Sequence, residues 1–329
     1  MAKNRPTRED VAELAGVAPS TVSLILNDRA KDLGIAEATR QRVEEAARAL
    51  GYYANRHIRA VRSGRTGNVG LYLRHDQWGT STGYWSALRG ALDRAISEAD
   101  LGLLVHCGRE DIPTEEAFAR QAGGVVDGVL IFNSANDPIA ARLLETGMHA
   151  VEIGDPGGPL PYVAVDSADG VRQALEHLHG RGYRRPCFVN FPSPYENSIQ
   201  ARREAFERES ERLYGAAGPS VDDFFGELAL ESVLALRPRP DCAVCVSDEH
   251  ALGLLAAATK RGMSVPEDLA ITGFDCLPTP GLARTVTSVC TPLEDLARAG
   301  VAKLMALIDG QPTERETVLP VALRVGDTS

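Results

Sequence analysis

Apolar positions in the first fifty residues recur at the spacing of short amphipathic helices. Thr7 stands before the first apolar run and Asp10 follows three residues later, a pattern typical of a capping box at a helix start. Val11, Leu14 and Ala15 then share one face of the predicted helix. The chain is therefore expected to begin with a short helix whose apolar face needs a packing partner.

Two further helices are predicted before residue 52. Gly16 provides the permissive backbone of a tight turn, and Pro19 suits the first position of a second helix. The third helix is predicted from Glu37 to Leu50, and Gly51 ends it. The inward positions predicted for these two helices are Val22, Ile25, Leu26, Val43, Ala46, Ala47 and Leu50.

From residue 68 onward, short apolar runs alternate with helical patterns of roughly 10–15 residues. This alternation predicts an α/β fold of parallel βαβ units, and because it is too long for one small open sheet we expect two doubly wound lobes. Two facing lobes form a cleft beside the carboxyl ends of their strands, where ligands bind in such folds. Strands are expected at 69–73, 101–106, 125–132, 150–153, 163–166, 186–191, 243–247 and 269–274, with a last strand over 318–325, and helices at 85–99, 114–123, 138–147, 169–181, 198–212 and 249–262.

The order of helix, tight turn, second helix and third helix is that of a helix-turn-helix, in which the second helix enters the DNA major groove. Ser20, Thr21 and Ser23 point away from the predicted core, and such hydroxyls can bond bases or phosphates. An ordinary three-helix bundle with a solvated Ser and Thr surface fits the same periodicity. The apolar pattern alone leaves these two interpretations open.

Charge is distributed unevenly along the chain. The net charge of −10 over 329 residues indicates, taken alone, a poor nucleic-acid ligand. Residues 1–66 nevertheless hold 12 Lys and Arg against 8 Asp and Glu, a net charge of +4, so the remainder carries −14. Residues 54–66 contain four Arg and no acidic residue. This asymmetry indicates a basic arm on an acidic body and restores nucleic acid as a candidate partner.

Other features narrow the class of protein. The N-terminal residues lack a signal-peptide core and no run of about 18 apolar residues occurs, so we expect a cytoplasmic location, at the nucleoid when bound to DNA. Cys242 and Cys245 lie in a strand-like run without a second pair, which favours buried thiols over a metal or redox site. No nucleophile elbow, phosphate loop or metal cluster is visible, so neither an enzyme nor a cofactor is expected.

Specific motifs favour the helix-turn-helix interpretation. TREDVAELAGVAPSTVSLILN (7–27) and TRQRV (39–43), followed by LGY (50–52) and Asn55, resemble the start of the LacI/GalR family of transcriptional regulators. The resemblance implies an all-α helix-turn-helix headpiece and a periplasmic-binding-protein-like core of two parallel-sheet lobes. Weaker echoes follow in the family's order, among them VDGVL (126–130), REAF (203–206), SD (247–248), GFD (273–275) and PL (292–293).

The resemblance also implies which residues contact DNA. Pro19–Asn27 corresponds to the recognition helix, and Asn55–Arg62 to a hinge helix that lies in the minor groove of an operator bound by a dimer. A segment this short is not a stable helix alone, and its basic character makes folding against DNA reasonable. The implied DNA-binding residues are Thr7, Pro19, Ser20, Thr21, Ser23, Leu24, Asn27, Asn55, Ile58, Val61 and Arg62.

Several positions depart from the family pattern. Val61 replaces a Leu that wedges between base steps, so we expect a weaker kink in the DNA. Leu24 stands where several relatives have an Arg that reaches guanine, and a Leu cannot donate a hydrogen bond. Ala18 and Ala36 replace Ser, so two helix caps are missing. These departures leave the DNA-binding role intact but leave the operator sequence open.

An effector between the two lobes is implied as well. The flat C–H faces and hydroxyl rim of a sugar suit an aromatic platform with carboxylate and guanidinium partners. Trp85 fits a core aromatic equally well, and Arg203 could instead form a salt bridge on a helix face. The implied effector-binding residues are Tyr84, Trp85, Arg203, Ser247, Asp248 and Asp275.

The sequence therefore predicts a ligand-responsive transcriptional regulator, expected to be a repressor, that binds a near-palindromic operator as a homodimer. The alternative is a small-molecule binding protein without a DNA role, which would not need the basic N-terminal block. The absence of a trailing apolar heptad favours a dimer over a tetramer. The expected domains are 1–54 for the headpiece, 55–67 for the hinge helix and linker, and 68–329 for the core, with lobe 1 near 68–165 plus 292–320 and lobe 2 near 166–291 plus 321–329.

Overall fold

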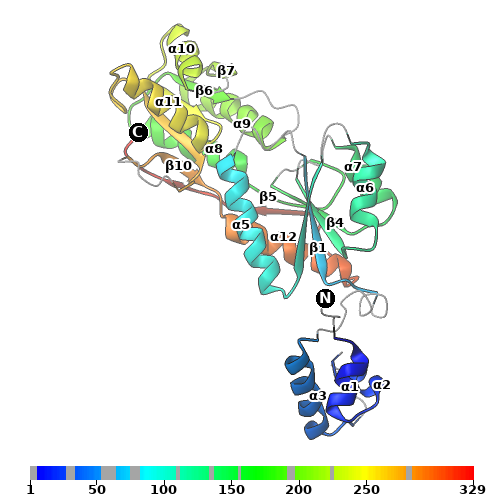
Figure 1. Ribbon diagram of the computed structural model, residues 1–329. Coiled ribbons are helices and arrows are strands. Elements are labelled where there is room, and N and C mark those ends of the chain that lie inside the picture. Colours follow the sequence, from blue (N-terminus) through cyan, green and yellow to red (C-terminus); the bar gives the residue numbers. More distant parts are fainter. Residues whose placement is uncertain are drawn as a thin grey trace. The chain divides into compact units, whose positions relative to one another are not determined.

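The computed structural model describes most of the chain, in two units. Contacts group the residues into Met1–Gly67 and Asn68–Ser329, and each unit is described by itself. In its described residues the first unit is helical, and the second alternates strands with helices (Figure 1). The described residues are 6–26, 34–52, 64–74, 82–108, 112–132, 137–154, 157–190, 197–222, 226–278 and 284–329.

Among its described residues, the first unit packs three short helices, α1 (Arg8–Ala15), α2 (Pro19–Ile25) and α3 (Glu37–Leu50). The predicted capping box at the start of α1 is confirmed. Thr7 N donates to Asp10 Oδ2 at 2.7 Å, and Asp10 N donates to Thr7 Oγ1 at 3.3 Å. Two otherwise unpaired backbone donors are thereby satisfied where the helix begins.

The core of this unit differs from the prediction at its edges. Leu14 is 58% exposed, because α1 contacts both α2 and α3 and its buried stripe runs through Val11, Ala12 and Ala15. Leu14 lies about 100° around the helix axis from the middle of that stripe. Leu50, the last residue of α3, is 36% exposed, and Leu26 is half-buried. The other predicted inward positions are buried, namely Val22, Ile25, Val43, Ala46 and Ala47.

The second unit is built on two six-stranded sheets. Sheet A has the strand order β11-β5-β4-β3-β1-β2, and sheet B has the order β12-β10-β9-β8-β6-β7. The paired strands are parallel except for β10 with β12. The predicted α/β fold with two parallel-sheet lobes is therefore confirmed. The elements are β1 (Asn68–Arg74), α5 (Thr82–Glu98), β2 (Gly102–Gly108), α6 (Thr114–Ala122), β3 (Gly128–Ile131), α7 (Pro138–Glu145), β4 (Ala150–Ile153), β5 (Tyr162–Val165), α8 (Ser167–Gly180), β6 (Pro186–Asn190), α9 (Asn197–Tyr214), β7 (Ser220–Asp222), α10 (Glu227–Ala235), β8 (Cys242–Cys245), α11 (Asp248–Lys260), β9 (Ala270–Asp275), β10 (Thr287–Cys290), α12 (Leu293–Ile308), β11 (Glu316–Leu319) and β12 (Ala322–Arg324).

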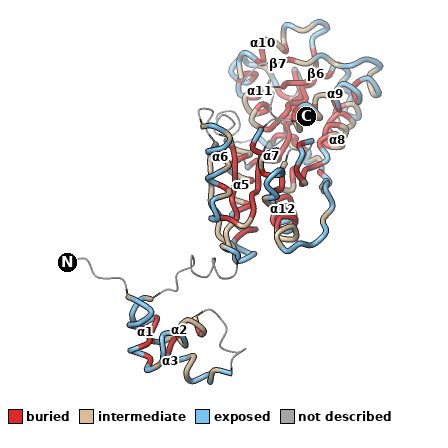
Figure 2. The backbone as a smooth tube through the Cα atoms, turned by 90° about the vertical axis from the view of Figure 1, so that its right-hand side faces the viewer, coloured by how far each residue is buried: buried red, intermediate tan, exposed pale blue. Residues whose placement is uncertain are grey.

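Helices cover both faces of each sheet. In sheet A, Leu71 packs with α5 and α12, whereas the next residue, Tyr72, packs with α6 and α7. In sheet B, Phe188 faces α8 and α9, and Val189 faces α10 and α11. Strands covered on both sides are buried throughout, as Figure 2 shows, and this explains their continuous apolar runs in the sequence. Within the described ranges, no helix combines the length and apolar character that a membrane span requires.

The chain passes between the two sheets three times. β5 leads to α8 on sheet B, β10 leads to α12 on sheet A, and β11 leads to β12. The prediction of one strand over 318–325 is wrong. Pro320 has no N–H to continue a ladder, and the segment divides into one strand in each sheet. The sequence pattern also did not single out β7, α10, β10 or α12.

The missing caps give a stability prediction. Ala18 and Ala36 occupy the N-caps of α2 and α3 without a side-chain cap hydrogen bond. Ala36→Ser supplies a hydroxyl acceptor to the first turn of α3, so it should stabilise the first unit by about 1 kcal/mol in urea unfolding followed by helical circular dichroism. Ala49→Ser, at an exposed position inside α3, is the matched control and should be neutral or slightly destabilising. An equal gain from both variants would contradict the capping explanation.

Candidate functional site

The accessible side of α2 carries several of the positions predicted to contact DNA. Two buried side chains, Val22 and Ile25, anchor the helix, and both α1 and α3 contact it. Thr7, Pro19 and Ser20 are exposed, and Thr21, Ser23 and Leu24 are half-buried. The helix therefore has one side fixed in the core and one accessible side rich in hydroxyls. The other predicted DNA contacts, Asn27, Asn55, Ile58, Val61 and Arg62, lie outside the described residues.

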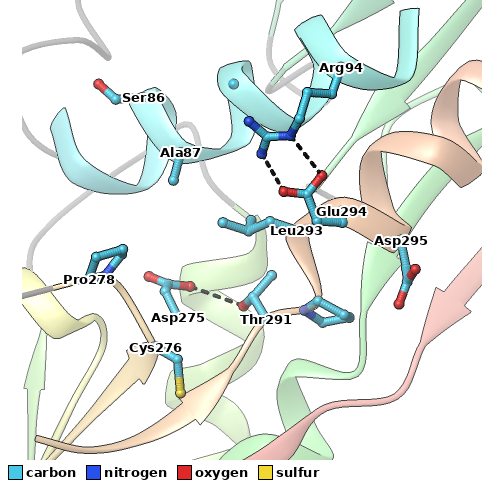
Figure 3. Close-up of a pocket in the computed structure, with 12 residues that line it drawn as sticks. Ser86, Ala87, Arg94, Asp275, Cys276, Pro278, Thr291, Leu293, Glu294 and Asp295 are labelled. Atoms are coloured by element: carbon cyan, nitrogen blue, oxygen red, sulfur yellow. Dashed lines mark hydrogen bonds and ion pairs between the residues drawn. The ribbon is translucent and has the colours of Figure 1, made fainter. Parts of the chain in front are cut away.

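A cavity of about 610 Å³ opens at the carboxyl ends of β9 and β10. Figure 3 shows α5 on one side of it and the strand ends, with Asp275 and Thr291, on the other. Thr291 Oγ1 donates to Asp275 Oδ1 at 3.2 Å, and Arg94 of α5 pairs with Glu294 of α12. Crevices at the carboxyl ends of parallel strands are where ligands bind in α/β folds.

A buried ion pair includes the cavity carboxyl Asp275. Arg202 of α9 is 8% exposed, and its Nη2 lies 3.8 Å from Asp275 Oδ1. Its Nη1 donates to the carbonyl oxygen of Val246 at 2.7 Å, and its guanidinium carbon lies 3.6 Å from the centre of the Phe274 ring. Burial raises the pKa of Asp275 to about 8, and the positive charge of Arg202 opposes that shift. A guanidinium and a carboxyl thus meet where β8 and β9 end.

The neighbouring Arg203, the position implied by the family motif, lies in a different environment. Its Nη1 is 3.3 Å from Asp222 Oδ2 and its Nε is 3.4 Å from Glu207 Oε1, and 34% of its side chain is exposed. Arg202 was not among the predicted residues, although its spacing from Phe206 places both on the buried face of α9. The structure brings Arg202 to Asp275, and a role for Arg203 in effector binding stays a prediction.

Ser247 and Asp248 begin α11 beside β9 and β10, and Ser247 is the N-cap residue. Asp248 is 1% exposed. Its Oδ1 accepts from Ser288 Oγ at 2.5 Å, and its Oδ2 accepts from Leu277 N at 2.7 Å. Burial raises the pKa of Asp248 to about 6, and its charge contributes to the raised pKa of Asp275. Asp248 therefore ties the segment after β9 to β10, and its predicted contact with an effector is untested.

The aromatic pair predicted to bind a sugar face lies on α5. Trp85 is 6% exposed, and its ring centre is 4.9 Å from that of Phe132 and 5.1 Å from that of Tyr84. Trp85 belongs to the core beneath α5, and no acceptor among the described residues pairs with its buried Nε1. Tyr84 is half-buried. The structure thus places Trp85 in the core, while stacking of either ring on a sugar stays a prediction.

One hydrogen bond links helices of the two sheets at this edge. Glu249 Oε1 of α11 accepts from Gly83 N, in the first turn of α5, at 2.6 Å. A carboxylate suits the positive end of a helix of 17 residues. No sequence pattern signals this contact, because its partners are 166 residues apart.

The cysteines whose side chains the structure describes fall into two groups. Cys187, Cys242 and Cys245 are buried free thiols, and burial raises the pKa of each, so the expectation of buried thiols at 242 and 245 is confirmed. Cys276 and Cys290 form a disulfide that the sequence pattern did not predict. Their pairing depends on the register of β9 and β10, which sets Asp275 opposite Cys290. In the part of the chain that the structure describes, no cluster of His, Cys, Asp and Glu could hold a metal ion.

The two adjacent arginines give a paired stability prediction. Arg202→Met removes the buried donor from the Val246 carbonyl and from Asp275, so it should destabilise the second unit by about 3 kcal/mol. Arg203→Met removes partly exposed ion pairs and should cost less than about 1 kcal/mol. Urea unfolding of the full chain, followed by near-ultraviolet circular dichroism, measures both. Equal losses would contradict the assignment of Arg202 as the buried partner.

Known proteins share this architecture. Residues 7–55 match the family model of bacterial regulatory proteins of the lacI family, and residues 175–329 match that of a periplasmic binding protein-like domain. The chain is 31% identical to the HTH-type transcriptional regulator CelR of Thermobifida fusca, over 95% of this chain and 94% of that protein. It is 30% identical to the HTH-type transcriptional regulator GntR of Pseudomonas aeruginosa, over 93% of this chain and 90% of that protein.

Solved structures extend the comparison. A transcriptional regulator CelR–cellobiose complex matches with a TM-score of 0.71 and 30% identity, covering 99% of this chain and 100% of that one. A lac repressor dimer bound to operator and the anti-inducer ONPF matches in fold with a TM-score of 0.84 at 21% identity, over 99% of each chain. The resemblance found in the sequence is confirmed. With about a third of its residues identical to CelR over nearly its whole length, the chain belongs to the lacI family of bacterial transcriptional regulators.

Proposed function

We propose that this regulator is a repressor that binds a near-palindromic operator as a homodimer and releases or strengthens that binding in response to a small sugar-like effector. Residues 1–54 read the DNA, residues 55–67 connect the two parts, and residues 68–329 bind the effector. Within the core, lobe 1 comprises 68–165 and 292–320, and lobe 2 comprises 166–291 and 321–329. The protein acts in the cytoplasm, at the nucleoid when it is bound to DNA.

The buried pair of Arg202 and Asp275 is the observation that carries the effector part of this proposal. The pair offers fixed donors and acceptors at the carboxyl ends of β8 and β9, where a ligand hydroxyl losing its water needs such partners. The adjacent cavity of about 610 Å³ falls within the usual range of small-molecule sites, about 300–1,000 Å³. The cellobiose complex of the related CelR supports a saccharide as the ligand class.

The geometry of α2 supports the DNA-reading part. Val22 and Ile25 fix the helix in the core of the first unit, so its accessible hydroxyls are presented from a packed scaffold. Ser20, Thr21 and Ser23 can bond base edges or phosphates. Leu24 adds an apolar contact that suits a thymine methyl rather than guanine. The operator is therefore expected to lack a guanine requirement at the base pair facing Leu24.

Measurements of effector affinity distinguish the roles of the adjacent Arg202 and Arg203. In thermal-shift titrations with cellobiose and with monosaccharides, a bound effector raises the apparent Tm by mass action. Arg202→Lys should raise the effector Kd by about tenfold or more, because an ammonium cannot replace a planar guanidinium fork. Arg203→Lys should change the Kd by less than about threefold. The opposite order would assign the effector contact to Arg203, and no shift with any saccharide would reject the sugar class.

Substitutions that remove the hydroxyls of α2 test the proposed DNA binding. Ser20→Ala combined with Thr21→Val should weaken binding to a fragment of the regulated promoter by about tenfold or more, since two contacts per protomer are lost. Binding to unrelated DNA should change little, because it depends on phosphate charge. Gln41→Ala, on the exposed side of α3, is the control. Fluorescence anisotropy across a salt series measures all three proteins. A wild type without sequence preference at every salt concentration would reject the DNA-reading role.

A further inference from the structure

The Cys276–Cys290 disulfide lies at the wall of the cavity and is accessible. Cys276 lines the cavity beside Asp275 (Figure 3), and both cysteines are half-buried. The other thiols that the structure describes, at positions 187, 242 and 245, are at most 2% exposed. Small reagents in solution can therefore reach the disulfide but not these three buried thiols.

The disulfide joins the two strand ends that build the cavity. Cys276 follows Asp275, the last residue of β9, and Cys290 ends β10 immediately before Thr291. Thr291 is the residue that donates to Asp275. Directly after Thr291 the chain leaves sheet B for α12 on sheet A. The bond is thus placed beside the proposed effector carboxyl and at one of the three connections between the sheets.

The backbone at this point has a conformation that needs support. Asp275 and Cys276 have φ values of 111° and 54°, which residues with a Cβ disfavour. Cys276 N donates to Ser288 Oγ at 3.1 Å, and Leu277 N donates to Asp248 Oδ2 at 2.7 Å. The disulfide is the covalent restraint that accompanies these hydrogen bonds. Without the disulfide, Asp275 and Cys276 can relax toward negative φ, which changes the cavity wall.

The setting of the bond indicates a reversible role. A DNA-binding regulator works where low-molecular-weight thiols keep most cysteines reduced, and disulfides formed in such compartments are mostly transient or redox-sensing. We propose that Cys276 and Cys290 form a reversible dithiol–disulfide site whose redox state sets the shape of the effector cavity. This inference rests on the proposed function for its reducing compartment and for the ligand that occupies the cavity.

A hydroperoxide is the class of oxidant that this site takes. One thiolate attacks the O–O bond and becomes a sulfenic acid, and the oxygen that leaves takes up a proton to form water or an alcohol. The second thiolate attacks the sulfenic sulfur, which forms the S–S bond and expels hydroxide, and the hydroxide takes up a proton to form water. The two sulfurs lose two electrons and the peroxide gains them. Two equivalents of a low-molecular-weight thiol reverse the bond by exchange, leaving as a disulfide and returning two protons to the cysteines.

Native alkylation tests the site itself. Full-length protein is treated with reduced glutathione, freed of it, and reacted with iodoacetamide without denaturant before peptide mass spectrometry. Cys276 and Cys290 should be labelled, whereas Cys187, Cys242 and Cys245 should not. Hydrogen peroxide added after reduction should protect the pair again. A pair that glutathione cannot reduce in the folded protein, or that peroxide does not restore, would overturn the proposal.

Hydrogen exchange tests the effect on the cavity. Peptides covering 274–278 and 288–292 should exchange about tenfold faster or more in the dithiol form, because the Cys276 and Leu277 amides lose their restraint. The double variant Cys276→Ser, Cys290→Ser should exchange at the faster rate with and without peroxide. Equal exchange in the two wild-type forms would reject the coupling of redox state to cavity shape.

A cellobiose titration of both redox forms separates this inference from the proposed function. Redox-dependent exchange without any sugar binding would keep the dithiol–disulfide site and reject the sugar effector. Sugar binding with the same Kd in both forms, together with equal exchange, would keep the effector and reject the redox control.

Discussion

Burial of a guanidinium against a carboxyl at the carboxyl ends of β8 and β9 is the constraint on which the architecture of the site depends. Asp275 and Arg202 are 5% and 8% exposed, and either group buried alone would carry a large desolvation cost. Each therefore needs partners from several elements. Arg202 reaches the Val246 carbonyl from α9, and Thr291 donates to Asp275 from the end of β10. The positions of α9 and of the three strand ends are linked through this one pair.

The same burial suits this site to the proposed effector. Burial raises the pKa of both Asp248 and Asp275, and the single guanidinium of Arg202 opposes that shift without cancelling it. Ligand hydroxyls can donate hydrogen bonds to such carboxyls, whereas apolar groups cannot. For effector binding to change DNA binding, the effector must also bind one arrangement of the lobes more tightly than another. The three chain crossings and the hydrogen bond between Glu249 and Gly83 are among the links between the two sheets on which such a difference acts.

The sequence predicts most of the fold because the interactions that define its helices and strands are local or follow a periodic apolar pattern. Thr7 and Asp10 form their capping box within one helical turn, and strands covered on both faces appear as apolar runs. The divided strand at Pro320 was missed, because its two halves take their partners, β5 and β10, from different sheets.

The candidate site could be predicted only in part. Asp248 and Asp275 were identified at strand ends, but Arg202 and Arg203 differ by one helical position, and only packing decides which of them turns inward. The Cys276–Cys290 bond depends on strand register, and the Glu249–Gly83 bond joins residues distant in sequence. Neither leaves a local pattern that a single sequence can reveal.

If one chain couples an operator-reading unit to a sugar-binding core, the affinities for the two ligands depend on each other. The most direct measurement is the reciprocal linkage between the two ligands, with the operator Kd determined at saturating cellobiose and the cellobiose Kd at saturating operator. Each ligand is predicted to change the Kd of the other by the same factor, as coupling between two sites on one protein requires. Tight binding of both ligands with neither Kd altered by the other would contradict it.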